Sequence, residues 1–487
     1  MSQIQYLGEN LWVGQIGHFA IILAFVTALL SAFSFFKAIL DKEPSGEWKK
    51  IGRWSFYIHG ISVFVLIGLI FYAMYFQMYE YKYVFDHVSP DLPMRYILSA
   101  FWEGQEGSFM LWMFWHIILG FIFIRSNYQM ESPVMFIVVI CQAILATMLL
   151  GFVIPWGEES FKIGSNPTVL LRQMMDAPIF NNANYLSLIK GGGLNPLLQN
   201  YWMTIHPPTL FLGFAMTIFP FGFAFGGLLK NDHVSWLNDA YKWSLFGAGI
   251  LGIGILMGSF WAFEALSFGG YWNWDPVENA SLVPWITLVA GLHTHMIARH
   301  TGHGLRSTYF YYIISFVLIL YSTFLTRSGV LGDSSVHSFT QMGLEWQLVG
   351  LVSLFFILGL GLWIFRYKSI PNPKKEENFL IFEVCGYQLG VHPKKNSVKT
   401  FNLGCRIYNT YDFIFTGCSF IFVAILYFYF CRHIRNGLQS RLFDWCRPTK
   451  IKNGSICYFS FWIRNDDGRT HYQWPARPLC FFKPICF

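Results

Sequence analysis

Residues 11–36 read LWVGQIGHFAIILAFVTALLSAFSFF and contain no Asp, Glu, Lys or Arg. An apolar run of about 20 residues is long enough to cross a bilayer as a helix. Nine such runs occur along the chain, at 11–36, 55–76, 109–124, 133–154, 208–229, 244–261, 283–298, 309–326 and 346–365. The sequence therefore predicts an all-α polytopic membrane protein, a bundle of about nine or ten transmembrane helices.

Composition and charge agree with a membrane protein. The 487 residues are 54% hydrophobic and only 13% charged, whereas soluble domains carry about 25% charge. The net charge of +7 does not indicate nucleic-acid binding, because the cations gather in alternate loops. One set of loops holds 14 Lys and Arg, and the other, longer set holds 6. The positive-inside rule then predicts an outward-facing N-terminus. It also places four long loops outside, at 77–108, 155–207, 262–282 and 327–345.

The character of the chain changes after about residue 370. Residues 1–370 read as regular spans and loops, whereas 371–487 mix cysteines, aromatic residues and basic residues without a helical or strand period. Eight of the nine cysteines lie in this tail, and the whole chain has no CxxC pair, so it has no c-type haem attachment site of its own. Two interpretations remain open: an unusual C-terminal region with a weak tenth span at 413–430, or sequence out of frame after about residue 377.

The densest signal for function is the segment 258–285, GSFWAFEALSFGGYWNWDPVENASLVPW, which joins two expected spans on the outer side. Its aromatic residues include Trp261, Tyr271, Trp272 and Trp274, and Asp275 follows directly. Tryptophan and tyrosine gather at any membrane interface, so an aromatic belt is one interpretation. A flat aromatic wall beside a few polar groups is also what a porphyrin requires.

Histidines supply candidate ligands for iron. His206 lies at the outer end of the fifth expected span, before two prolines that suit a helix start. His337 lies in the outer loop after the eighth span. Two imidazoles facing each other form an axial pair for haem iron, whereas a single loop histidine is usually a surface residue. His293 lies within the seventh span, where a polar side chain is a functional candidate.

Five stretches resemble the family of CcmF/NrfE-type cytochrome c haem lyases, whose members carry a Trp-rich WWD loop. They are Phe101–Ser108 (FWEGQEGS), Gly193–Gln199 (GLNPLLQ), Ile205–Pro208 (IHPP), Gly269–Ser281 (GGYWNWDPVENAS) and Arg327–Leu331 (RSGVL) followed by His337. The resemblance runs from about residue 95 to 345, and WDPVENAS is typical of this branch of the haem-handling proteins.

The resemblance implies a role for each matching residue. His206 and His337 match the outer-face histidines that ligate the haem awaiting attachment. Trp272, Trp274 and Asp275 match the core of the haem-binding loop. His293 matches the first of two membrane histidines that hold a b-type haem. The family's second membrane histidine lies on a late helix, and this sequence offers no convincing match for it.

The implied function is cytochrome c-type biogenesis at the bacterial inner membrane, with the functional loops on the periplasmic side. The chain is expected to bind haem and to position it for attachment to the CxxCH thiols of apocytochrome c, as a haem lyase. Expected partners are a haem-delivery chaperone, apocytochrome c, other maturation proteins and membrane lipid, with no nucleic acid. A haem transporter and a non-catalytic haem relay are the alternatives.

Overall fold

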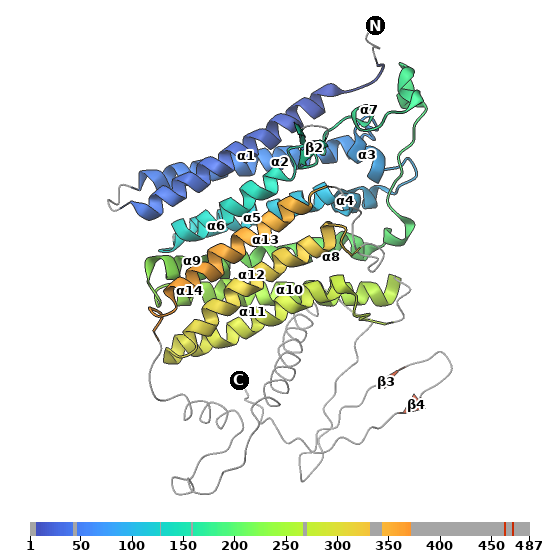
Figure 1. The fold of residues 1–487 in the computed structure, drawn as a ribbon. Helices are drawn as coiled ribbons and strands as arrows, with labels where there is room; N and C mark the ends of the chain where they lie inside the picture. Colours follow the sequence, from blue (N-terminus) through green and yellow to red (C-terminus); the bar gives the residue numbers. More distant parts are fainter. Residues whose placement is uncertain are drawn as a thin grey trace, which may run out of the picture. The chain divides into compact units, whose positions relative to one another are not determined.

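The computed structural model of the chain describes residues 6–41, 46–126, 128–156, 159–265, 270–331, 343–371, 462–463 and 470–471. Within these ranges it is a bundle of long, roughly aligned helices (Figure 1). Among the described residues, eight continuous helical segments are long and apolar enough to cross a membrane. The chain is thus an all-α, multi-pass membrane protein, as its sequence predicts.

The elements follow one another in a simple order. The first half contains α1 (Leu11–Leu40), α2 (Glu47–Tyr75), α3 (Lys82–His87), α4 (Met94–Glu103), α5 (Gln105–Arg125), α6 (Glu131–Thr147), β1 (Phe152–Trp156), β2 (Glu159–Ile163), α7 (Leu171–Met174) and three short 3-10 turns, η1 (Pro178–Asn181), η2 (Tyr185–Ser187) and η3 (Pro196–Leu198). The second half contains α8 (Tyr201–Met216), α9 (Ile218–Lys230), α10 (Leu237–Ala265), α11 (Pro276–Thr301), α12 (Leu305–Arg327), α13 (Glu345–Phe356), the π-helical turn η5 (Ile357–Gly361) and α14 (Leu362–Arg366).

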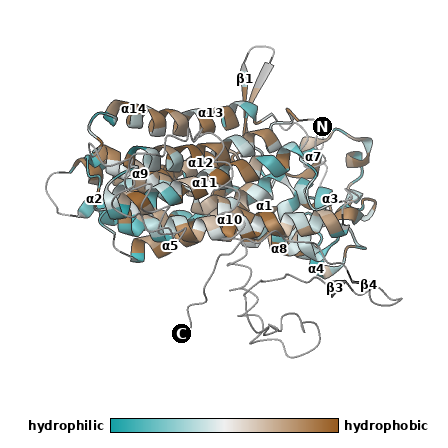
Figure 2. Ribbon diagram, turned by 90° about the horizontal axis from the view of Figure 1, so that it is seen from below, coloured by the Kyte–Doolittle hydropathy of each residue, from teal (hydrophilic) through white to brown (hydrophobic). Residues whose placement is uncertain are grey.

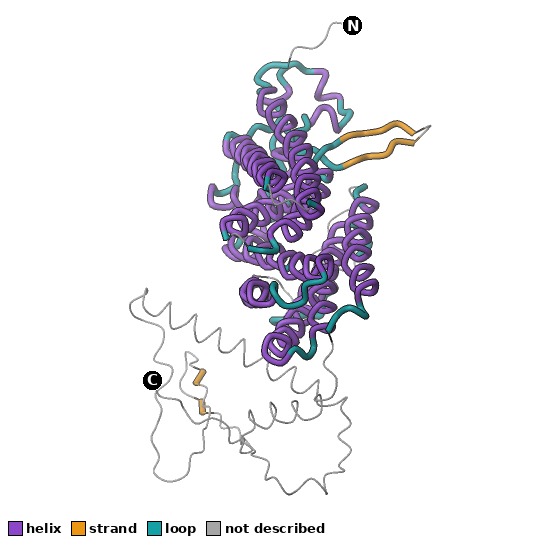
Figure 3. The backbone as a smooth tube through the Cα atoms, turned by 90° about the vertical axis from the view of Figure 1, so that its left-hand side faces the viewer, coloured by secondary structure: helices purple, strands orange, loops and turns teal. Residues whose placement is uncertain are grey.

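Two expected spans have different limits in the structure. The run at 133–154 forms only the 17-residue helix α6, because residues 152–154 belong to strand β1. This strand pairs antiparallel with β2, and the hairpin projects away from the helices (Figure 3). The run at 208–229 is part of a longer segment, α8 and α9, that starts at Tyr201 and breaks at Thr217. The expected helix start at the prolines was therefore wrong.

Hydrophobic residues cover the lengths of the helices, and hydrophilic residues gather toward their ends (Figure 2). The connections after α1, α5, α9 and α11 lie at one end of the bundle, and those after α2 and α10 lie at the other (Figure 1). This alternation is what the loop assignment requires. Which end faces outward stays a prediction from the cation count.

Ion pairs join neighbouring connections at the cation-rich end. The carboxylate of Glu131, at the start of α6, is fully buried and lies 2.6 Å from Nε of Arg53 and 2.8 Å from Nζ of Lys49, both on α2. A buried carboxylate requires such partners, because an unpaired charge is costly away from water. The pairs fix the ends of α2 and α6 against each other.

Two of the membrane histidines have structural partners. Between α1, α2 and α6, His59 is fully buried, with Nδ1 2.9 Å from the carbonyl of Ala24 and Nε2 2.9 Å from the side-chain oxygen of Gln142. Similarly, His295 on α11 contacts the hydroxyl of Tyr312 and the carbonyl of Leu237. Both imidazoles therefore join helices together.

The chain divides into two units, residues 1–419 and residues 420–487. The described part of the second unit consists of two short antiparallel strands, β3 (Trp462–Ile463) and β4 (Thr470–His471). The expected span at 413–430 lies outside the described residues.

Candidate functional site

The expected site gathers where α8 begins, α10 ends and α11 begins. Glycines allow α8 and α10 to approach closely. A Cβ added to Gly213 would come within 2.6 Å of the Cα of Leu251, and one added to Gly254 within 2.9 Å of the Cα of Leu210. Close packing of backbones through small residues is a common way to join helices in lipid. The N-terminal turns of α8 are thereby held against the last turns of α10.

Pro207 and Pro208 lie inside α8 rather than at its start. Proline has no N–H group, so Pro207 cannot bond the carbonyl of Met203 four residues earlier. The indole N–H of Trp102, at the end of α4, donates to this carbonyl over 2.8 Å. Trp102 belongs to the FWEGQEGS segment, so two of the five sequence motifs meet here. Its role was missed from the sequence, because the two prolines were interpreted as a helix start, where they leave no helix carbonyl without a donor.

His206 lies in the second turn of α8 and faces α10. Its Nδ1 is 2.9 Å from the carbonyl oxygen of Gly254, and because a carbonyl can only accept, Nδ1 carries the proton. The lone pair then resides on Nε2, the tautomer that binds a metal through Nε2. Gly258 is required beside the ring, since a Cβ there would come within 2.9 Å of Cε1. The ring of Trp261 packs 5.7 Å from the imidazole.

An aromatic surface lies near His206, at the start of α8 and the end of α10, and is formed by Tyr201, Trp202, Phe260, Phe263 and Tyr271. Trp202 and Phe260 are parallel within 7°, at 6.1 Å between ring centroids. Phe263 and Tyr271 are parallel within 7°, at 4.2 Å, and Tyr271 meets Phe260 edge-on. The indole of Trp202 donates to Glu264 over 2.7 Å, and the hydroxyl of Tyr201 does so over 3.1 Å. Glu264 therefore holds the two leading rings of α8 against α10, a role that the sequence did not reveal.

Asp275 begins α11. Its side chain accepts from the backbone N–H of Val277 over 2.8 Å, Pro276 occupies the first helical position, and Glu278 completes a capping box. Acidic residues at these positions satisfy the N–H groups at a helix start and favour its dipole. The run WDPVE thus has a local structural function, in addition to the haem-loop role that resemblance implies for Asp275.

Trp274 has a backbone conformation that is unusual for its residue type. Its φ is +57°, a left-handed conformation that costs an L residue about 1–2 kcal/mol. The carboxylate of Glu278 accepts from the N–H groups on both sides, 3.0 Å from Asn273 and 3.3 Å from Asp275. These bonds fix the turn, and the indole is left 73% exposed. A strained residue that presents a large ring to the outside is a candidate for ligand contact.

Two indole N–H groups beside the aromatic surface have buried nitrogens without a hydrogen-bond acceptor among the described residues. They belong to Trp261 and Trp272, and the ring of Trp272 meets that of Trp274 edge-on at 6.4 Å. Buried donors nearly always have an acceptor in a native protein. An anionic group bound here would supply one.

The other two expected iron ligands have different outcomes. His337 lies outside the described residues, so the expected pair with His206 has no measured geometry. His293 is on α11, with Nδ1 2.8 Å from the carbonyl of Val289 one turn earlier. Its side chain is on the exposed surface of the described bundle, so the structure does not place it at the aromatic surface.

Three comparisons relate the chain to known proteins. Residues 102–331 match the family model described as cytochrome C assembly protein. The chain is 31% identical to the cytochrome c-type biogenesis protein CcmF of Pseudomonas aeruginosa over 76% of this chain and 52% of that protein. It is 29% identical to the cytochrome c-type biogenesis protein NrfE of Haemophilus influenzae over 75% of this chain and 54% of that protein.

The fold is also similar to that of a solved protein, the cytochrome c haem lyase CcmF. The TM-score is 0.54 at 21% identity, over 81% of this chain and 59% of that one. The chain spans about half the length of the curated relatives it matches.

Proposed function

Because the chain belongs to the CcmF/NrfE-type family of cytochrome c biogenesis proteins, we propose that it binds haem at the outer face of the bacterial inner membrane. There it positions haem for attachment to the CxxCH thiols of apocytochrome c. The domain that does this is the bundle of residues 1–370, with the loop at 258–285 as its haem-binding part.

One observation carries the proposal: His206 lies beside the aromatic surface in the tautomer that a haem ligand requires. Its Nδ1 proton is fixed by the carbonyl of Gly254 at 2.9 Å. A backbone carbonyl on the second nitrogen is the usual support for a ligating histidine. The imidazole therefore has the tautomer that binds iron through Nε2.

The surrounding residues fit the rest of a porphyrin. The exposed rings of Tyr271 and Trp274 offer flat apolar contact. The indole N–H groups of Trp261 and Trp272, buried without an acceptor in the described part of the chain, match the propionate carboxylates. His337 would supply the second axial ligand. The bound haem supplies two vinyl groups, and each thiol adds across one of them, sulfur to one carbon and hydrogen to the other.

The work of the protein is then positioning. His206 holds the iron from one side, and the aromatic surface orients the ring plane while keeping the vinyl edge accessible. The histidine of the incoming CxxCH motif replaces one axial ligand, which brings both thiols close to the vinyl groups. Such orientation lowers the barrier of a two-body reaction without acid–base chemistry. We assign no acid or base to the thioether step.

His293 would hold a second, b-type haem within the membrane. Its imidazole lies on the exposed surface of α11, where a ligand from a further helix could approach. Partners follow from the reaction: a haem-delivery chaperone, apocytochrome c and other maturation proteins. The cation-poor end of the bundle would face the periplasm.

The first experiment measures haem in purified protein by absorption spectroscopy. His206→Ala and His337→Ala should each lower the haem content and abolish the low-spin spectrum of a bis-histidine site. The matched control is His300→Ala, since His300 is exposed at the opposite end of α11. Unchanged haem content in the double variant would contradict the assignment.

A second experiment separates a lyase from a relay. Haem-loaded protein is mixed with a reduced apocytochrome peptide that carries CxxCH, and covalent haem is followed by mass spectrometry. A lyase yields the thioether product, and a relay yields only transferred, non-covalent haem. The orientation is tested apart from activity: reporter fusions at Ser160 and Gly302 should report opposite sides of the membrane.

A further inference from the structure

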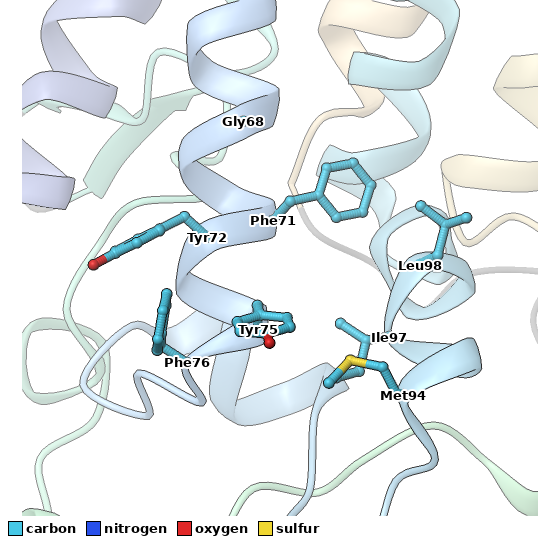
Figure 4. A pocket seen from close by; sticks show the side chains of 8 residues that line it. All are labelled: Gly68, Phe71, Tyr72, Tyr75, Phe76, Met94, Ile97 and Leu98. Atoms are coloured by element: carbon cyan, nitrogen blue, oxygen red, sulfur yellow. The ribbon is translucent and has the colours of Figure 1, made fainter.

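A groove lies on the outside of the bundle, between the end of α2 and α4. It is lined by Gly68, Phe71, Tyr72, Tyr75, Phe76, Met94, Ile97 and Leu98 and has a volume of about 370 Å³ (Figure 4). Phe71 reaches from α2 toward α4, and Met94, Ile97 and Leu98 line the facing side (Figure 4). Cavities of about 300–1,000 Å³ accommodate small-molecule ligands.

The groove is open where Gly68, an exposed lining residue, has no side chain. A Cβ added to Gly68 would meet no atom within 4 Å. The lining is otherwise apolar or aromatic, and Tyr75, Phe76, Met94 and Leu98 are all exposed. The groove is thus continuous with the part of α2 that faces lipid.

Polar groups lie near this groove, at the end of α2 and on α4. The rings of Tyr72 and Tyr75 lie in the last turn of α2, where tyrosine typically meets lipid head groups. Arg95 is exposed on α4 between the groove residues Met94 and Ile97. Its guanidinium lies 4.9 Å from the ring centroid of Tyr96, and the described part of the chain contains no ion pair to it. A cation beside an apolar groove complements a molecule with an anionic head and a long apolar tail.

We propose that this groove is a binding site for one phospholipid, with an acyl chain between α2 and α4 and its phosphate near Arg95 and the tyrosine hydroxyls. The phospholipid would join the outer ends of the two helices. Because α4 ends near Trp102, which bonds the backbone of α8, the lipid would also support the helix that carries His206. The lipid site itself does not depend on haem binding.

The test uses the full chain in detergent and counts bound lipid by native mass spectrometry during titration with phosphatidylglycerol. Gly68→Leu adds a side chain to the lining at a position where a Cβ meets nothing within 4 Å, and it should remove one bound lipid per chain. Gly350→Leu is the matched control, because Gly350 on α13 is also exposed and a Cβ there also meets nothing within 4 Å. An equal lipid count for the Gly68→Leu and wild-type chains would overturn the proposal.

Arg95→Gln tests the head-group contact separately. A basic residue near a membrane surface contributes about 1 kcal/mol to anionic lipid binding, so affinity should fall about fivefold. Inorganic phosphate at millimolar concentration should not displace the lipid, because the acyl chain provides most of the contact. Displacement by phosphate would mean that Arg95 binds the anion alone, and would refute the groove as the site.

A photo-crosslinking residue at position 98, in place of Leu98, identifies the occupant in membranes. A mass increase of one phospholipid supports the proposal. A crosslink to a second copy of the chain, or to another protein, would show that the groove is a protein interface and would overturn it.

Discussion

Trp274 provides a test of the site that does not require haem. Its φ of +57° costs about 1–2 kcal/mol for any residue with a Cβ, whereas glycine adopts it freely. We compare Trp274→Gly with Trp274→Ala, because both variants lack the indole and only one keeps a Cβ. The side chain is 73% exposed, so its removal sacrifices little burial in either case.

The expected difference follows from two opposing terms. The folded glycine variant is released from about 1–2 kcal/mol of conformational strain. Against this, glycine gives the unfolded chain more conformational entropy, which lowers the stability of the folded state by about 0.5–1 kcal/mol. Glycine should therefore be more stable than alanine at position 274 by about 1 kcal/mol. A difference of 1 kcal/mol changes the ratio of closed to open turn by about fivefold.

Hydrogen exchange at the amides of Asn273 and Asp275 measures this opening directly, since both donate to Glu278. Protection should be about fivefold higher in Trp274→Gly than in Trp274→Ala. The control is Gly350→Ala within α13, where alanine should instead be the more stable residue by about 1 kcal/mol. Equal or greater protection in Trp274→Ala would refute the strained turn. Both variants should also bind haem more weakly, if the ring contacts it.

Three further predictions concern the supports of the site. Trp102→Phe should destabilise the bundle by about 1–3 kcal/mol, because it leaves the carbonyl of Met203 unpaired. Adding Pro207→Ala restores a helical N–H for this carbonyl and should recover part of the lost stability, measured by thermal unfolding. If the effects of the two substitutions simply add, the proposed pairing of Trp102 with this carbonyl is contradicted. Asp275→Ala should cost about 1 kcal/mol and Asp275→Asn much less, since asparagine also caps helices, and equal losses would show that charge rather than capping matters. Burial lowers the pKa of His233, in the loop between α9 and α10, below its ordinary value of 6.5. The unfolded chain then binds more protons, so stability is complete above pH 6.5 and falls as pH decreases through the folded pKa; His233→Gln should weaken this dependence, and an identical pH profile in that variant would contradict it.

Several features of the fold were readable because they depend on neighbouring residues only. Apolar runs predicted the long helices, since each must satisfy its own backbone in lipid. The run WDPVE contains a helix cap, a proline at the first helical position and the capping-box acid within five residues.

Two predictions from the local sequence were wrong, one about the limits of a span and one about the start of α8. Hydrophobicity alone does not distinguish helix from strand in a short run, so residues 152–154 were counted in a span although they form β1. The prolines after His206 suggested a helix start, but α8 continues through them. It can do so because Trp102, about a hundred residues away in the chain, pairs with the carbonyl that Pro207 leaves open.

The sequence by itself determined the membrane class, most of the spans, the cap of α11 and the residue types that suit haem. Only the tertiary structure decided which nitrogen of His206 carries the proton, through Gly254 on another helix. It alone decided that Glu264 holds Trp202, and that Glu278 fixes the turn at Trp274. Hydropathy and capping act over a few residues, whereas the partner of a side chain depends on how distant segments pack, and no local pattern records that.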